Sequence, residues 1–240
     1  MAITRAAMPF PVVPGKTLED LRGPGKRFEA EPDAWAESRR RVGVTLERVY
    51  FQETPMGNFI IAYVESSRPL ADVLSGPGRS DLEIDRWFAE QVKELHGVDL
   101  SQPPQGPAPE QVGEWVDPAV TQTKRGFAFC APFVAEMLDK GRAWAAETFA
   151  SEGMTESRRR LGESKEIVTL FHTPNGPVTG IYLEGDDPIA ANRKFTESQE
   201  PFDVDFRNML KQLFPPFVNF DQPVPGITEI FDSQKLPVSV

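Results

Sequence analysis

Residues 37–65 read ESRRRVGVTLERVYFQETPMGNFIIAYVE, and residues 156–184 read ESRRRLGESKEIVTLFHTPNGPVTGIYLE. The second stretch follows the first at a constant offset (156 − 37 = 119), so Tyr63 matches Tyr182. Both contain ESRRR, a glycine two residues later, a Thr-Pro-x-Gly turn and a Tyr-x-Glu ending. This self-similarity predicts a tandem duplication of a unit of roughly 110 residues, in two copies rather than a long array.

The match continues more loosely beyond these stretches. VDLSQP at 98–103 resembles VNFDQP at 218–223, and EWVD at 114–117 resembles EIFD at 229–232. Residues 101–123 are rich in Pro, Gly and Gln, a composition typical of an extended connection. We therefore expect a first repeat at 1–120, which includes this linker, and a second repeat at 121–240.

Each repeat shows the same order of expected elements. Alternating apolar residues predict a first strand at 127–133, and a weaker one at 8–13, whose prolines favour a sheet edge. A helix should follow, from about Val134 to Leu161 in the second repeat. Two strands joined by a Pro/Gly turn come next, then a second amphipathic helix, then a short strand that closes the unit. The expected strands are 47–53, 59–64 and 114–117 in the first repeat, and 166–172, 177–183 and 229–232 in the second.

This order, β-α-β-β-α-β, is the ferredoxin-like arrangement and predicts an α+β fold. The hairpin strands are apolar on both faces, with Val49 and Phe51 opposite Tyr50, so both faces should be covered. A duplicated unit of this kind resembles the dimeric α/β-barrel superfamily in its single-chain form. The resemblance implies two ferredoxin-like units packed sheet to sheet as a pseudo-dimeric barrel. Members of that superfamily include cofactor-free oxygenases of aromatic polyketides, haem-handling enzymes, isomerases and proteins without known activity.

Composition excludes several classes of protein. The 240 residues carry a net charge of −10 and show no basic face, which argues against a nucleic-acid partner. No apolar stretch is long enough to cross a membrane, and the N-terminus lacks the pattern of a secretory signal. Cys130 is the single cysteine, which suits a reducing compartment. We expect a soluble, cytoplasmic protein.

His172 and Glu53 are the candidate catalytic residues. His172 ends the first hairpin strand of the second repeat, and Glu53 occupies the matching position of the first. An imidazole and a carboxylate are groups that can transfer protons in a cavity. The alternative is that both lie at an exposed strand end beside a turn.

A second set of residues is expected to line a ligand site. Tyr63 and Tyr182 align, and their hydroxyls can reach either a cavity or a backbone partner. Trp144 has no aromatic counterpart in the first repeat, and Phe171 lies next to His172. Positions that differ between repeats, including Gly180 against Ile61, are where one asymmetric pocket would arise.

Other motifs have structural explanations. The arginine triplets at 39–41 and 158–160 suit helix C-termini and ion pairs with Glu37 and Glu156. RGPGKR at 22–27 and LSGPGRS at 74–80 match no phosphate loop and predict helix interruptions. His96 is expected to cap a helix, and Cys130 to behave as a small core residue. No spacing of ligands predicts a metal site, and haem at His172 rests on the superfamily resemblance alone.

Two functions follow as hypotheses. The first is a cofactor-independent enzyme, of the monooxygenase or isomerase/cyclase type, that acts on a hydrophobic or aromatic small molecule. The alternative is a non-catalytic binding or interaction protein that uses the same barrel. Because the second repeat can cover the first, a monomer or weak homodimer is expected.

Overall fold

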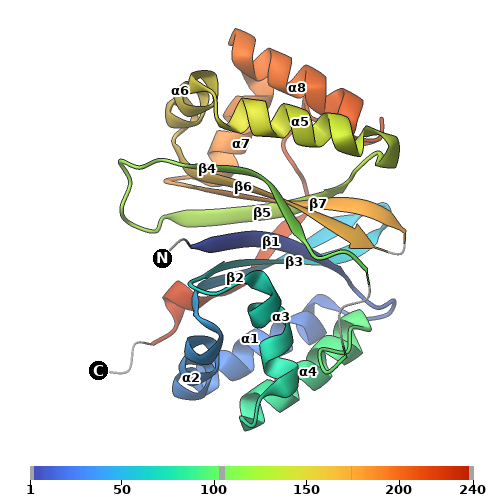
Figure 1. The fold of residues 1–240 in the computed structure, drawn as a ribbon, viewed down its shortest axis with the longest axis vertical. Helices are drawn as coiled ribbons and strands as arrows, with labels where there is room; N and C mark the ends of the chain where they lie inside the picture. The colour runs from blue at the N-terminus through green and yellow to red at the C-terminus, as the bar shows by residue number, and fades with distance from the viewer. Residues whose placement is uncertain (1–2, 103–105, 174, 238–240) are drawn as a thin grey trace. The chain divides into compact units, whose positions relative to one another are not determined.

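The computed structural model describes residues 3–102, 106–173 and 175–237. Pro174 of the predicted second turn and residues 103–105 of the linker lie outside them. Over the described residues the chain is an α+β protein with two four-stranded antiparallel sheets (Figure 1). The strand orders are β1-β3-β2-β8 and β4-β6-β7-β5.

The element order matches the expected one, with a helix pair wherever a single helix was predicted. The first part of the chain forms β1 (Thr4–Pro11), α1 (Leu18–Ala30), α2 (Pro32–Val42), β2 (Val44–Thr54), β3 (Gly57–Ser66), α3 (Leu70–Arg79) and α4 (Glu83–His96). The second part forms β4 (Glu110–Val116), β5 (Arg125–Pro132), a 3-10 turn (Ala135–Met137), α5 (Leu138–Phe149), α6 (Glu152–Leu161), β6 (Glu163–Thr173), β7 (Gly176–Gly185), α7 (Pro188–Glu197), α8 (Pro201–Leu213), β8 (Ile227–Asp232) and a last 3-10 turn (Ser233–Lys235). As its prolines predict, β1 lies at a sheet edge.

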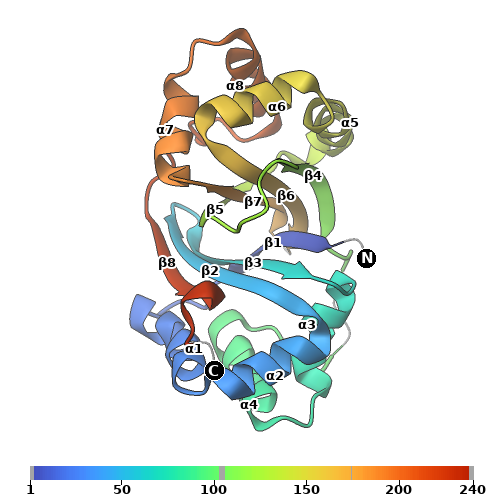
Figure 2. The same ribbon diagram turned by 90° about the vertical axis from the view of Figure 1, so that its left-hand side faces the viewer.

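The closing strands correct one expectation. We expected EWVD and EIFD to close their own repeats, but β4 pairs with β6 and β8 pairs with β2. Each sheet therefore takes its fourth strand from the other half of the chain, and Figure 2 shows β8 running beside β2. The chain accordingly divides into two compact units. The first comprises Met1–Ala6, Phe10–Ala108 and Thr228–Val240, and the second comprises Ala7–Pro9 and Pro109–Ile227.

The helix stops are those the sequence predicts. Gly43 and Gly162 end α2 and α6 in the left-handed conformation, with φ of 76° and 86°. This conformation favours glycine because it has no Cβ to clash with the backbone. Three arginines occupy the last turn of each helix, where cations offset the negative end of the helix dipole.

The prediction that two Gly-Pro segments interrupt helices is wrong. Residues 22–27 lie inside α1 and residues 74–79 inside α3, with Pro24 and Pro77 as helical residues. The glycines allow close packing that offsets their low helix propensity. A Cβ at Gly76 would lie 2.2 Å from Val42 Cγ1, and one at Gly78 would lie 2.1 Å from the Leu100 carbonyl oxygen.

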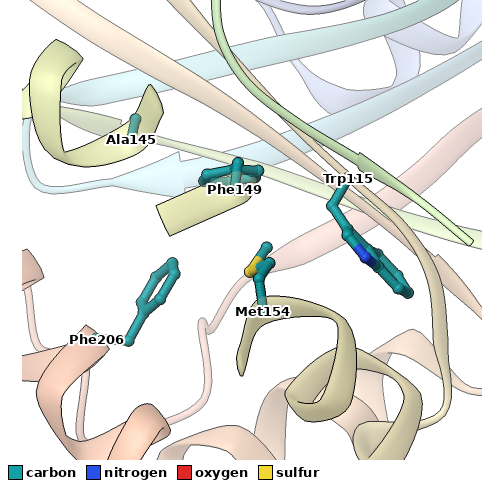
Figure 3. Packing of buried hydrophobic residues seen from close by; sticks show 5 residues of the cluster. All are labelled: Trp115, Ala145, Phe149, Met154 and Phe206. Atoms are coloured by element: carbon teal, nitrogen blue, oxygen red, sulfur yellow. The ribbon is translucent and has the colours of Figure 1, made fainter. Parts of the chain in front are cut away.

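In each unit the helices pack on one face of the sheet. In the first unit, Phe51 and Ile60 pack against Leu21 of α1 and Leu95 of α4. In the second, a cluster joins β4 to the helices, and Figure 3 shows its five buried members: Trp115, Ala145, Phe149, Met154 and Phe206. Side chains alternate along a strand, so the opposite face of each sheet carries the neighbouring residues. No helix among the described residues has the length and apolarity that a membrane span requires.

Candidate functional site

The helix-free face of each sheet carries a buried tyrosine–glutamate pair. In the second unit, Tyr182 donates a hydrogen bond to Glu184 Oε2 at 2.9 Å. Lys165, on the neighbouring strand, lies 3.1 Å from Glu184 Oε1. Tyr182 and Glu184 are both 0% exposed, so this carboxyl group is buried and is satisfied by a phenol and an ammonium group.

The first unit repeats this pair with a different cation. Tyr63 donates to Glu65 Oε1 at 2.7 Å, and Arg5 Nε lies 3.6 Å from the same oxygen. The Tyr-x-Glu ending of each repeated stretch is thus an interaction between side chains on one face of one strand. The structure places Tyr63 and Tyr182 in equivalent, fully buried positions on β3 and β7.

The helix-free face of the first sheet is more polar than the sequence predicts. Arg48, Tyr50 and Gln52 of β2 are all buried there, and Arg48 Nε lies 3.2 Å from Asp232 Oδ2 of β8. The expectation that the hairpin strands are apolar on both faces is therefore wrong for β2. A run that reads as apolar by its Val, Tyr and Phe includes polar residues that the fold buries and pairs.

Gly180 differs from its counterpart Ile61 for a packing reason. Gly180 pairs with Thr169 across the hairpin, whereas Ile61 pairs with Tyr50. The second unit includes the backbone of Ala7, whose N–H donates to Thr169 Oγ1 at 3.0 Å. A Cβ at Gly180 would lie 2.2 Å from the Ala7 carbonyl oxygen. The missing side chain makes room for backbone at this position, so this difference does not create a pocket there.

The candidate catalytic residues lie at strand ends. His172 of β6 is half-buried beside the turn, on the face that carries Val168 and Leu170. Glu53 of β2 is exposed and pairs in register with Asn58. Glu53 belongs to the first compact unit and His172 to the second.

Trp144 and Phe171 occupy different environments. Trp144 of α5 packs against Phe206 of α8, with ring centroids 4.8 Å apart in an edge-to-face arrangement. It belongs to the helix-side core of the second unit. Phe171 of β6 is half-buried and lies on the helix-free face, the same face as Tyr182. Of the four expected ligand-lining residues, Tyr182 and Phe171 therefore share one sheet face.

A second polar cluster lies on the helix side and is built from the repeated Ser-Arg pair. In the first unit, Arg39 Nε donates to Glu47 Oε2 at 2.6 Å, and Ser38 donates to Asp85. Arg39 is 5% exposed, and its guanidinium lies 5.0 Å from the ring of Phe88. The pair joins α2 to β2 and to α4.

The second unit has the same arrangement, built from Ser157 and Arg158 of α6. Arg158 donates to Glu166, and Ser157 donates to Asp203 Oδ1 at 2.5 Å. Although burial alone would raise it, hydrogen bonds from Ser157, Ser198 and Arg160 lower the pKa of Asp203.

The arginine triplets thus have a structural role, as expected, but their partners differ between repeats. Arg40 and Arg41 pair with Glu37 as predicted. Arg159 and Arg160 pair instead with Asp117 and Asp203.

Sequence reasoning did not single out Glu163, which lies within this cluster. Its Oε2 lies 3.5 Å from Arg158 Nε, and its side chain is 2% exposed. Burial raises the pKa of Glu163 to about 8, against the opposing effect of Arg158 and with the support of Glu166 and Asp203. Comparison of the two repeats could have identified Glu163, because the matching residue of the first repeat is the apolar Val44.

The two remaining reactive side chains are explained by their surroundings. His96 ends α4, and its Nδ1 lies 3.0 Å from the Pro11 carbonyl oxygen. Burial lowers the pKa of His96, and the contact with Pro11 opposes this effect. Burial raises the pKa of the Cys130 thiol to about 12, so this thiol is inert. Across the described residues, no group of three or more His, Cys, Asp or Glu side chains is arranged to hold a metal ion.

Two solved structures resemble this chain. The first is described as a "putative monooxygenase" from Fusobacterium nucleatum subsp. nucleatum; it is 10% identical, with 95% of this chain and 89% of that one covered and a TM-score of 0.48. The second is described as an "anthrone oxidase-like protein"; it is 11% identical, with 95% and 88% covered and a TM-score of 0.46. No family model and no curated protein matches the sequence. Both likenesses are distant, and neither carries a site residue to this chain.

Proposed function

We propose that this chain binds a small hydrophobic or aromatic molecule in its second unit, on the helix-free face of β6 and β7. The observation that supports this most is the chain of Tyr182, Glu184 and Lys165, a buried acid–base group on a sheet face. A hydroxyl held by a carboxylate has a fixed direction and can orient a polar group of a ligand. Phe171 on the same face supplies an aromatic surface for an apolar ligand.

The duplicated, sheet-to-sheet α/β barrel belongs to the same proposal. Repeats at 1–120 and 121–240 would have arisen by tandem duplication, with the pseudo-dimeric packing that the superfamily resemblance implies. The offset of 119 residues and the two tyrosine–glutamate pairs support this origin. A chain that contains both units would need no second copy to complete the barrel.

Catalysis without a cofactor is the enzymatic form of the proposal. His172 lies at the end of β6 on the face opposite Phe171 and Tyr182, so it would act as a general base, of the monooxygenase or isomerase/cyclase type, on a substrate that extends past the end of the strand. Glu53 would serve in the first unit. The alternative is a binding or interaction protein without turnover. The half-buried position of His172 beside the turn supports the general-base assignment, because a side chain at a strand end is partly open to solvent.

The first experiment is native mass spectrometry of freshly purified protein. A species heavier than the 26.8 kDa chain, which returns to that mass on denaturation, identifies the retained molecule. Tyr182→Phe should lower its occupancy, while the matched control Tyr63→Phe in the first unit should not. A bare mass, together with no binding of 1-naphthol by calorimetry, would contradict the proposal.

A second variant separates catalysis from binding. His172→Ala should retain the molecule that the wild type carries and lose its conversion, with the product followed by mass spectrometry. Equal conversion by His172→Ala and the wild type would contradict the catalytic role and favour the alternative of binding alone.

A further inference from the structure

Glu163 is a buried carboxyl group that distinguishes the second repeat from the first. It begins β6 directly after Gly162, and the residue is 6% exposed. The matching residue in the first repeat, Val44, begins β2 and is 8% exposed. An apolar residue therefore fits this position at the start of the strand, and the fold does not require a carboxyl group there.

The charged groups around Glu163 come from three elements. Arg158 belongs to α6, Glu166 belongs to β6, and Asp203, which Arg160 of α6 contacts, belongs to α8. Arg158 Nε donates to Glu166, and Arg160 Nη2 donates to Asp203 Oδ2 at 2.6 Å. Each arginine thus has a carboxylate of its own. Within the described part of the chain, Glu163 Oε2 is buried and has no hydrogen-bond donor.

The balance of charge favours a proton on Glu163. Two arginines face three carboxyl groups, and an uncompensated carboxylate in a buried site costs several kcal/mol or takes up a proton instead. Water does not compensate the charge, because the Glu163 side chain is only 2% exposed. Its neighbour Arg158 is covered by aromatic rings, with its guanidinium 4.7 Å from the ring of Phe206 and 5.1 Å from that of Phe195. A neutral Glu163 leaves Arg158 bound to Glu166 and Ser157.

We propose that Glu163 is a proton-operated switch in the second unit, which holds α6 and α8 against β6 when it is protonated and loosens them when it is ionised. Ionised Glu163 competes with Glu166 for the Arg158 guanidinium. Arg158 also contacts Ser157, and Ser157 contacts Asp203, so a shift of the guanidinium disturbs the link to α8. This switch goes beyond the proposed function and does not depend on a ligand.

The direction of the pH effect follows from linkage. Burial raises the pKa of Glu163 in the folded protein to about 8, above the value of 4.5 for an unperturbed glutamate. Between these values the unfolded chain has released a proton that the folded chain still holds, so stability falls as pH rises. The contribution is complete below the unfolded pKa and is lost as pH passes through the folded pKa.

Two variants and one control test the switch by thermal unfolding. Glu163→Gln keeps the shape without the charge, Glu163→Val installs the residue of the first repeat, and Glu156→Gln changes an exposed carboxylate on the same helix. From about pH 5 to about pH 9, the wild-type Tm should fall by at least about 5 °C more than that of either Glu163 variant. Glu156→Gln should follow the wild type.

Infrared spectroscopy tests the same proton directly in the wild-type protein. The wild type at neutral pH should show a protonated-carboxyl C=O band that is absent from Glu163→Gln and Glu163→Val. Near-ultraviolet circular dichroism should change at pH values above the transition, because Trp144 packs on Phe206 and the Arg158 guanidinium lies over the ring of Phe206. Parallel Tm profiles for the wild type and Glu163→Gln, or no carboxyl band that the variants remove, would overturn the proposal.

Discussion

Arg39 shows what a single buried cation does in this protein. It bonds Glu47 of β2, contacts Ser38 and lies over aromatic rings, all away from water. Arg39→Met should lower the free energy of unfolding by about 3–5 kcal/mol, since Glu47 is left as an uncompensated buried charge. Urea denaturation measures this loss.

A double variant separates the pair from its packing. Arg39→Met with Glu47→Leu should recover most of the lost stability, because two apolar residues of similar volume replace a buried ion pair. If the double variant were as unstable as the sum of the two single ones, the ion pair would not be the cause.

The burial of His96 gives a prediction about the pKa of its imidazole. Burial lowers its pKa below the ordinary value of 6.5, so its neutral form is favoured in the folded protein. Its contribution to stability is present above that value and is lost as pH falls. Titration of the two histidine ring signals by NMR should show one midpoint below that of free histidine. His172→Ala assigns the signals, and a His96 midpoint at or above 6.5 would contradict the burial argument.

The sequence predicts the site at this scale only in part. The offset of 119 residues aligns Tyr63 with Tyr182 in the sequence. The structure places the two tyrosines at equivalent, buried positions of β3 and β7. Their carboxylate partners were visible in the Tyr-x-Glu ending, but the cations were not, since Lys165 and Arg5 occupy unrelated positions. The sequence alignment of the repeats shows Glu163 where the first repeat has Val44. Only the structure shows that Glu163 is buried beside Arg158.

At the scale of elements, the exchanged strand β8 is the feature with the clearest consequence. Phe231 of β8 packs in the first unit against Phe28 and Trp35, with ring centroids 5.5 and 6.0 Å away. Phe231→Ala should cost about 3–5 kcal/mol, as other buried Phe→Ala substitutions do. Hydrogen–deuterium exchange should then rise in α1 and β2, far from residue 231 in the sequence.

The matched variant lies on the other exchanged strand. Trp115 of β4 is 6% exposed and donates to Thr155 Oγ1 at 3.0 Å. Trp115→Ala should raise exchange in α6 and β6 and leave α1 and β2 protected. If Phe231→Ala raised exchange in the second unit alone, the pairing of β8 with β2 would be wrong.

The exchange of strands also marks the limit of sequence reasoning about elements. The order of elements along the chain, the helix stops at Gly43 and Gly162 and the position of each hairpin follow from local pattern. The partner of the last strand does not, because EWVD and EIFD resemble each other and each suits either sheet. The prediction that the Gly-Pro segments interrupt helices is wrong for a related reason. Their glycines make contacts with residues outside their own helix, such as Gly78 with Leu100, which a local pattern does not show.

At the scale of the whole molecule, exchanged strands make each half of the chain incomplete. A polypeptide of residues 1–120 contains β1, β2 and β3 but lacks β8, which completes that sheet, and it carries β4 without its partner β6. An exposed strand edge of this kind seeks another strand. Residues 1–120 alone should therefore form a dimer in which β4 occupies the β8 position, or aggregate, while co-expressed 1–120 and 121–240 should purify as a one-to-one complex. Light scattering after size-exclusion chromatography distinguishes these states. A stable, monomeric 1–120 fragment with a cooperative unfolding transition would show that the first repeat closes its own sheet.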